Sequence, residues 1–102
     1  MTNTEKISKI QAVQSTGLPN ESIYYNLLEE IGDIQQHYYD YVSTNVDEEI
    51  KRLPNVDYHL CCCLLTLILR EDHFCNSFGN RYNSGIVNEI LDRMVLLLEK
   101  IG

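Results

Sequence analysis

The sequence predicts an all-α protein: a single small domain of four or five helices around a central apolar helix at about residues 57–71. The chain of 102 residues has the length of one domain, and a chain of that size buries roughly two-thirds of its extended surface on folding. Apolar residues recur at intervals of three and four, as they do on one face of a helix. Capping residues, glycines and prolines bound these stretches. The domain is therefore expected to span residues 1–102.

The first predicted helix covers residues 2–14, where Thr2 and Glu5 have the spacing of a capping box. Three apolar residues give it a weak buried stripe: Ile7, Ile10 and Val13. The turn-forming residues at 17–20 then end this helix.

The second predicted helix runs from Ser22 to about Tyr41. Gly32 lies within its apolar pattern and costs about 1 kcal/mol relative to alanine, so a kink or a close helix contact is expected there. Tyrosines cluster along this stretch, and they either line the rim of the core or form a platform for a ligand or partner. The cluster comprises Tyr24, Tyr25, Tyr38, Tyr39 and Tyr41.

A short helix is predicted from Asn45 to Leu53, where Pro54 stops it. Asn55 or Asp57 then caps the central helix. Its stretch from residue 60 to residue 69 is apolar on every side, so neighbouring helices must surround it.

The last predicted helix covers about residues 84–101 and is strongly amphipathic. Glu89 and Arg93 have the i, i+4 spacing of an ion pair. Val95 and Leu96 widen the apolar stripe beyond the needs of one core. This suggests a homodimer through helix 84–101, although a single exposed leucine would be ordinary.

The formal net charge of −7 is concentrated in residues 21–57, which hold nine acidic residues and two basic ones. Such a segment repels phosphate, which disfavours direct nucleic-acid binding. It is either a solvated surface or a docking surface for a basic partner protein. The residues predicted to form this acidic, tyrosine-rich surface are Glu29, Glu30, Asp33, Tyr38, Tyr39, Asp40 and Tyr41.

Residues 1–14 lack the apolar region of a signal peptide, and the longest apolar run is about half the ~20 residues of a membrane span. We therefore expect a cytoplasmic protein without membrane association. Cys61, Cys62 and Cys63 are consecutive, so in a helix they can neither pair with one another nor share a metal ion. They are expected to be small buried hydrophobic residues, and no metal or cofactor is predicted.

Residues 70–85 form a polar stretch between two apolar helices and are the predicted location of a function. Metal ligation by Glu71, Asp72, His73 and Cys75, and catalysis by Cys75 with His73, are the weaker interpretations because the supporting ligands and orienting groups are missing. The favoured interpretation is a structural connector in which arginines pair with nearby acids. A variant has this segment bind an anionic ligand or a partner loop. The candidate binding residues are Arg70, Asp72, His73, Asn76, Arg81 and Tyr82.

Residues 60–94 contain the pattern L-L-T-x-x-x-R-x-D-x-F-C, followed by G-x-x-x-x-I-L-x-R-M. This pattern resembles the C-terminal signature of an uncharacterised bacterial and phage family of unknown function. The resemblance covers about a third of the chain and implies a bacterial or phage source. It implies no activity, but it directs attention to Arg70, Asp72, Phe74, Gly85 and Arg93.

No nucleotide-binding, hydrolase or metalloprotease motif occurs in the sequence. The leading hypothesis is a non-catalytic interaction module, such as a phage or mobile-element inhibitor of a host defence protein, that acts through the acidic, tyrosine-rich surface. The alternatives are an oligomer that binds a small anion such as a nucleotide through residues 70–85, and a metal-dependent enzyme.

Overall fold

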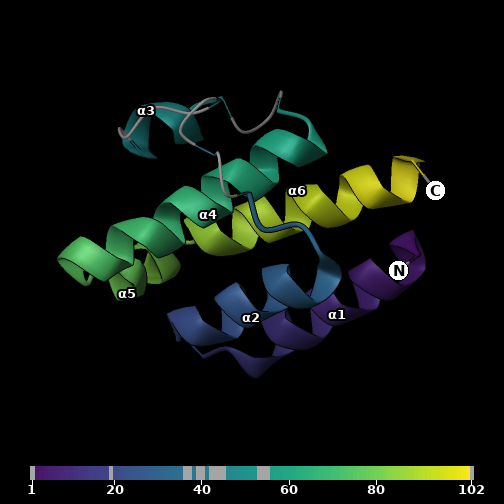
Figure 1. The fold of residues 1–102 in the computed structure, drawn as a ribbon, viewed down its shortest axis with the longest axis horizontal. Coiled ribbons are helices and arrows are strands. Elements are labelled where there is room, and N and C mark those ends of the chain that lie inside the picture. Colours follow the sequence, from purple (N-terminus) through teal and green to yellow (C-terminus); the bar gives the residue numbers. More distant parts are fainter. Residues whose placement is uncertain are drawn as a thin grey trace.

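The computed structural model is all-α, as the sequence predicts (Figure 1). It describes residues 2–18, 20–35, 38, 41, 46–52 and 56–101, apart from the side chains of residues 73–75 and 101. These ranges contain helices and no strand. The helices are α1 (Asn3–Thr16), α2 (Glu21–Ile31), α3 (Val46–Ile50), α4 (Tyr58–Cys75), α5 (Phe78–Asn83) and α6 (Ile86–Ile101).

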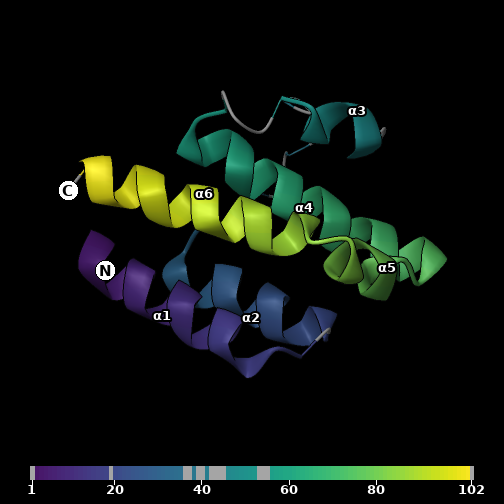
Figure 2. The same ribbon diagram turned by 180° about the vertical axis from the view of Figure 1, so that it is seen from behind.

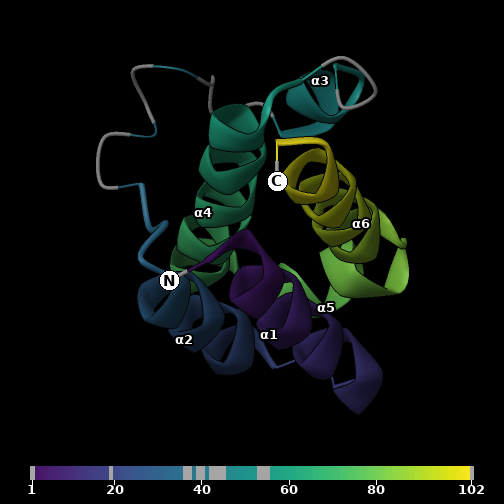
Figure 3. The ribbon, with the colours of Figure 1, turned by 90° about the vertical axis from the view of Figure 1, so that its right-hand side faces the viewer.

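The four long helices α1, α2, α4 and α6 form a bundle in which each packs against two others: α1 on α2, α2 on α4, α4 on α6, and α6 on α1 (Figure 3). Neighbouring helices run antiparallel. The start of α1 and the end of α6 therefore lie close together, as Figure 2 shows, and the Asn3 side chain donates a hydrogen bond to the Leu98 carbonyl. α3 packs outside α4, and α5 joins α4 to α6.

α1 begins with the predicted capping box, because the Thr2 hydroxyl accepts from the Glu5 N–H and the Glu5 carboxylate accepts from the Thr2 N–H. Gly17 ends the helix in the left-handed conformation at φ 63°. These local signals sit close together in the sequence, which is why they predicted this helix well.

α2 ends ten residues earlier than predicted. Gly32 adopts φ 78° and closes the helix as its C-cap, so its role is termination rather than a kink within a longer helix. Asn20 caps the other end by accepting from the Ser22 N–H at 3.0 Å. The apolar spacing continued to Ile34 because that residue packs on the same core from the segment after the helix.

α4 is the predicted central helix. Asp57 caps it by accepting from the Leu60 N–H at 2.8 Å. Every residue from 61 to 69 is buried, as expected for a helix that is apolar all round. The helix extends to Cys75, beyond the predicted end, and Asn76 closes it at φ 51°. The predicted boundary residues of the preceding short helix, Asn45, Leu53 and Pro54, and the candidate cap Asn55 lie outside the described residues.

α5 was not predicted; it is one short helix within the segment expected to be a connector. α6 follows Gly85, whose φ is 89°. The predicted pair of Glu89 and Arg93 is wrong: Arg93 instead donates two hydrogen bonds, of 3.1 and 3.2 Å, to the Val56 carbonyl just before α4. The guanidinium provides hydrogen-bond donors to the buried Val56 carbonyl. This contributes more to the free energy of folding than an exposed ion pair does.

Candidate functional site

A pocket of about 150 Å³ lies between α2 and the C-terminal half of α4. Its floor is formed by Leu28, Thr66 and Leu69, all buried, and Ile34 closes one side from the segment after α2. The Thr66 hydroxyl is already satisfied, because it donates to the Cys62 carbonyl at 2.7 Å. The floor is therefore effectively apolar.

The rim of this pocket is charged. Glu21 and Tyr25 come from α2, and Arg70 and Asp72 come from α4. Glu21 and Tyr25 are four residues apart, so they lie on one face of α2, and Glu29 continues that face into solvent. We call Glu21, Tyr25 and Glu29 the α2 acidic face. The sequence predictions included Arg70, Asp72 and Glu29 as candidate binding residues and Tyr25 as a member of the tyrosine cluster. They did not include Glu21, although its i, i+4 spacing from Tyr25 was an available signal.

Arg70 is exposed and makes no hydrogen bond or ion pair with another described residue. Most other basic side chains in the protein are engaged. Five pair with carboxylates and Arg93 binds a carbonyl, which leaves Arg70 and Lys100 as the cations without a partner in the described part of the chain. The engaged residues of the five pairs are Lys6, Lys9, Lys51, Arg52 and Arg81.

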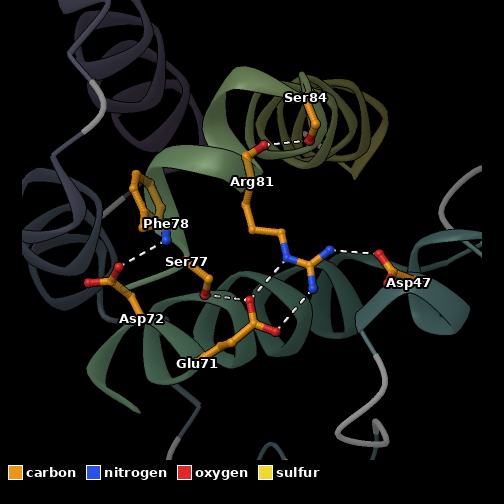
Figure 4. A network of polar contacts seen from close by, with 7 residues as sticks. All are labelled: Asp47, Glu71, Asp72, Ser77, Phe78, Arg81 and Ser84. Carbon is orange, nitrogen blue, oxygen red and sulfur yellow. Dashed lines mark hydrogen bonds and ion pairs between the residues drawn. The ribbon is translucent and has the colours of Figure 1, made fainter. Parts of the chain in front are cut away.

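Arg81 is the centre of a polar network that joins α3, α4 and α5 (Figure 4). Its Nε and Nη2 each donate to Glu71 at 3.0 Å, and its Nη1 donates to Asp47 at 2.7 Å. Ser77 also donates to Glu71 at 2.7 Å. Hydrogen bonding from Arg81 holds the pKa of the Glu71 carboxyl below its ordinary value.

The structure therefore separates the two arginines of residues 70–85. Arg70 lines the pocket beside α2, whereas Arg81 faces α3 and its charge is matched by two carboxylates. The pairing of Arg81 with Glu71 agrees with the interpretation of this segment as a connector. The two guanidinium groups are therefore not positioned to bind one anion together.

The other candidate residues of this segment have structural contacts. Asp72 accepts from the Phe78 N–H at 2.9 Å, which supports the start of α5. Asn76 closes α4. Tyr82 packs against Phe78 and Tyr24, with ring centroids 6.4 and 6.1 Å away. The side chain of His73 lies outside the described residues.

The predicted acidic, tyrosine-rich surface is only partly present. Glu29 is exposed without a described partner, and Glu30 is exposed but pairs with Lys9. Tyr38 is half-buried against the core, whereas Tyr41 is 54% exposed and its ring meets that of His59 edge-on. Tyr39 and Asp40 lie outside the described residues.

Asp33 differs most from its predicted role. It is largely buried, and its carboxylate accepts hydrogen bonds from Lys6 of α1 and the Tyr58 hydroxyl of α4. Burial raises the pKa of Tyr58 well above its ordinary value, so the phenol remains a donor. Asp33 thus links three helices and is not free to meet a partner.

The consecutive cysteines are buried, as predicted. Burial raises the pKa of the Cys61 thiol to about 12 and that of Cys63 to about 11, so both stay protonated and poorly nucleophilic at neutral pH. Within the described ranges, no group of His, Cys, Asp and Glu side chains has a metal-binding arrangement. The described helices also include none that is long and apolar enough to cross a membrane.

No protein-family model matches the chain, and no curated protein or solved structure is significantly similar to it. The resemblance of residues 60–94 to an uncharacterised bacterial and phage family therefore stays a prediction.

Proposed function

We propose that this protein is a non-catalytic interaction module that binds a basic partner protein through the α2 acidic face. The observation that carries the proposal is the imbalance between its charges. Six of its eight basic residues are engaged within the fold, so the net charge of −7 represents surplus carboxylates. Such a surface attracts a positively charged partner and accelerates its association.

The surplus carboxylates have different surroundings. Glu29 is exposed and lies one helical turn after Tyr25, whose exposed side chain lines the pocket. Glu89 and Glu99 also lack a described partner, but they lie on α6. Among the described side chains of α6, Leu96 is the one large apolar side chain that is exposed. A binding surface gains from an aromatic anchor beside its charges, which favours α2 over α6. The homodimer through helix 84–101 is a separate proposal, supported by the exposed side chain of Leu96.

Salt dependence tests this function. Tagged protein would be used to recover partners from a lysate of its native host at low ionic strength, and the affinity for each recovered protein would be measured between 50 and 300 mM salt. These salt concentrations span about a 2.5-fold change in Debye length. The proposal expects a partner with a basic surface and an affinity that falls steadily with salt. An acidic partner, or an affinity independent of salt, would contradict it.

The proposed biological setting is inhibition of a host defence protein by a phage or mobile-element product. It is supported by small size and negative charge. Co-expression of this protein with candidate defence systems tests the setting. Phage plating should be restored for the system that contains the basic partner. The Glu29→Lys variant should fail to restore it. Unchanged defence against phage in every system would count against this setting while leaving the binding function intact.

A further inference from the structure

We propose that the pocket between α2 and α4 receives a single arginine or lysine side chain of the basic partner, an inference that rests on the proposed function. It assigns the pocket an occupant, in addition to the surface attraction described above. Three properties of the pocket favour this occupant: its volume, the distribution of its apolar and charged groups, and the sign of its charge.

The volume suits one side chain. Pockets for small-molecule ligands are usually roughly 300–1,000 Å³, whereas this one is about 150 Å³. A nucleotide would therefore not be enclosed. The pocket has an apolar floor at Leu28 and Leu69 and a charged rim. Arginine and lysine have the complementary form, because their methylene stems bury against apolar groups while the charged end stays near water.

The charges on the rim favour a cation. Glu21 and Asp72 contribute two negative charges and Arg70 one positive charge. Each carboxylate keeps an acceptor oxygen: Glu21 uses Oε1 for the Ser22 hydroxyl, and Asp72 uses Oδ1 for the Phe78 N–H. The exposed ring of Tyr25 adds a face for a cation–π contact. An anionic ligand would meet this net negative rim within a protein of charge −7.

The positive charge of Arg70 repels the proposed cationic occupant. Removing this charge should therefore have opposite effects on the binding of a cation and of an anion. The Arg70 guanidinium is exposed and has no described partner to hold it over the pocket. It can therefore turn toward solvent, but its charge still weakens the attraction for an incoming cation. Replacing Arg70 with a neutral residue should tighten the binding of a cation and weaken the binding of an anion.

The experiment is a ¹⁵N–¹H chemical-shift titration of the full chain with three blocked tripeptides, acetyl-Ala-Arg-Ala-amide and its Glu and Gln counterparts. We expect the Arg peptide to shift the amide signals of residues around the pocket, with weak but measurable affinity. Glu21→Gln should weaken it about fivefold, as expected for one partly buried ion pair. Arg70→Gln should tighten it by a similar factor. Glu99→Gln, which removes the same charge on α6, should change it less than about twofold.

Two outcomes would overturn this inference. The Glu peptide could bind instead, and Arg70→Gln could weaken it, which would make the pocket an anion site. Alternatively, the Arg peptide could leave the pocket signals unchanged. If the salt-dependent partner still binds in that case, the proposed function stands and only the pocket assignment fails; if neither binds, both fail. The amide spectrum of each variant verifies that it is folded, so a lost fold cannot imitate a lost site.

Discussion

The network around Arg81 allows a quantitative prediction about what holds α3, α4 and α5 together. The Arg81 and Glu71 side chains are only 20% and 21% exposed, whereas Asp47 is 76% exposed. Exposed ion pairs contribute about 0.2–1 kcal/mol, and hydrogen bonds to charged groups contribute about 1.5–3 kcal/mol. The two-bond contact with Glu71 should therefore be worth about 1–2 kcal/mol, and the contact with Asp47 about 0.5 kcal/mol or less.

Two double-mutant cycles measure these couplings, one with Arg81→Ala and Glu71→Ala and the other with Arg81→Ala and Asp47→Ala. Urea unfolding followed by circular dichroism at 222 nm gives the free energy of unfolding of each variant. The hydrogen bond from Ser77 to Glu71 cancels within the first cycle. A Glu71 coupling below about 0.5 kcal/mol, or an Asp47 coupling as large as that of Glu71, would contradict this prediction, because burial and two-bond geometry would then have no effect.

The pH dependence of the same contact provides an independent control. The pKa of Glu71 is lower in the folded protein than its ordinary value of about 4.5. The stability it contributes is therefore fully present above that value and is lost as the pH falls through the folded pKa. The Glu71→Ala variant should lose less stability than the wild type between pH 6 and pH 3, and an equal loss would contradict the pairing.

Three further predictions concern buried thiols, a buried hydroxyl and two glycines. At pH 8, Cys61 and Cys63 should resist a thiol reagent in native protein and react only on unfolding, because burial raises their pKa; rapid labelling found by peptide mass spectrometry would contradict this. The Tyr24 hydroxyl is buried without a hydrogen bond of standard geometry, and the Tyr82 side chain is the polar group that interacts with it. Tyr24→Phe should therefore change the free energy of unfolding in urea by no more than about 1 kcal/mol, and a larger loss would show that Tyr24 and Tyr82 form a full hydrogen bond. Gly32→Ala should destabilise by about 1 kcal/mol because φ is 78°, while Gly79→Ala, in a helix with open space around it, should stabilise by about 0.5–1 kcal/mol; equal shifts in the urea midpoint would disprove this assignment.

The helices were predictable where the signal is local. The capping box at Thr2 and Glu5 and the apolar run of α4 depend on neighbouring residues alone, and both predictions are confirmed. The end of α2 was not predictable from the sequence, because an apolar side chain such as Ile34 can reach the core from a loop as well as from a helix. The pattern of buried residues thus continued after the helix had ended at Gly32.

The site was less predictable because it depends on contacts between distant segments. Arg70 and Arg81 lie in one polar stretch of the sequence, and both were predicted to have the same role. The fold directs one toward α2 and the other toward Asp47, 34 residues away in the sequence. Asp33 likewise looked like part of an acidic surface, yet the bundle buries it between Lys6 and Tyr58. Charge pairing in three dimensions, which composition cannot show, decides which residues remain free.

We propose that the α2 acidic face, rather than diffuse negative charge, binds a basic partner. The most direct test compares the double variant Glu21→Lys, Glu29→Lys with Glu89→Lys, Glu99→Lys, because both change the net charge from −7 to −3. The pairs are also matched in position, since Glu21 and Glu89 each lie in the first turn of a helix. Affinity for an amidated octa-arginine peptide would be measured by fluorescence anisotropy at fixed ionic strength. We predict a loss of about tenfold or more for the α2 pair and about twofold or less for the α6 pair; equal losses would contradict the claim.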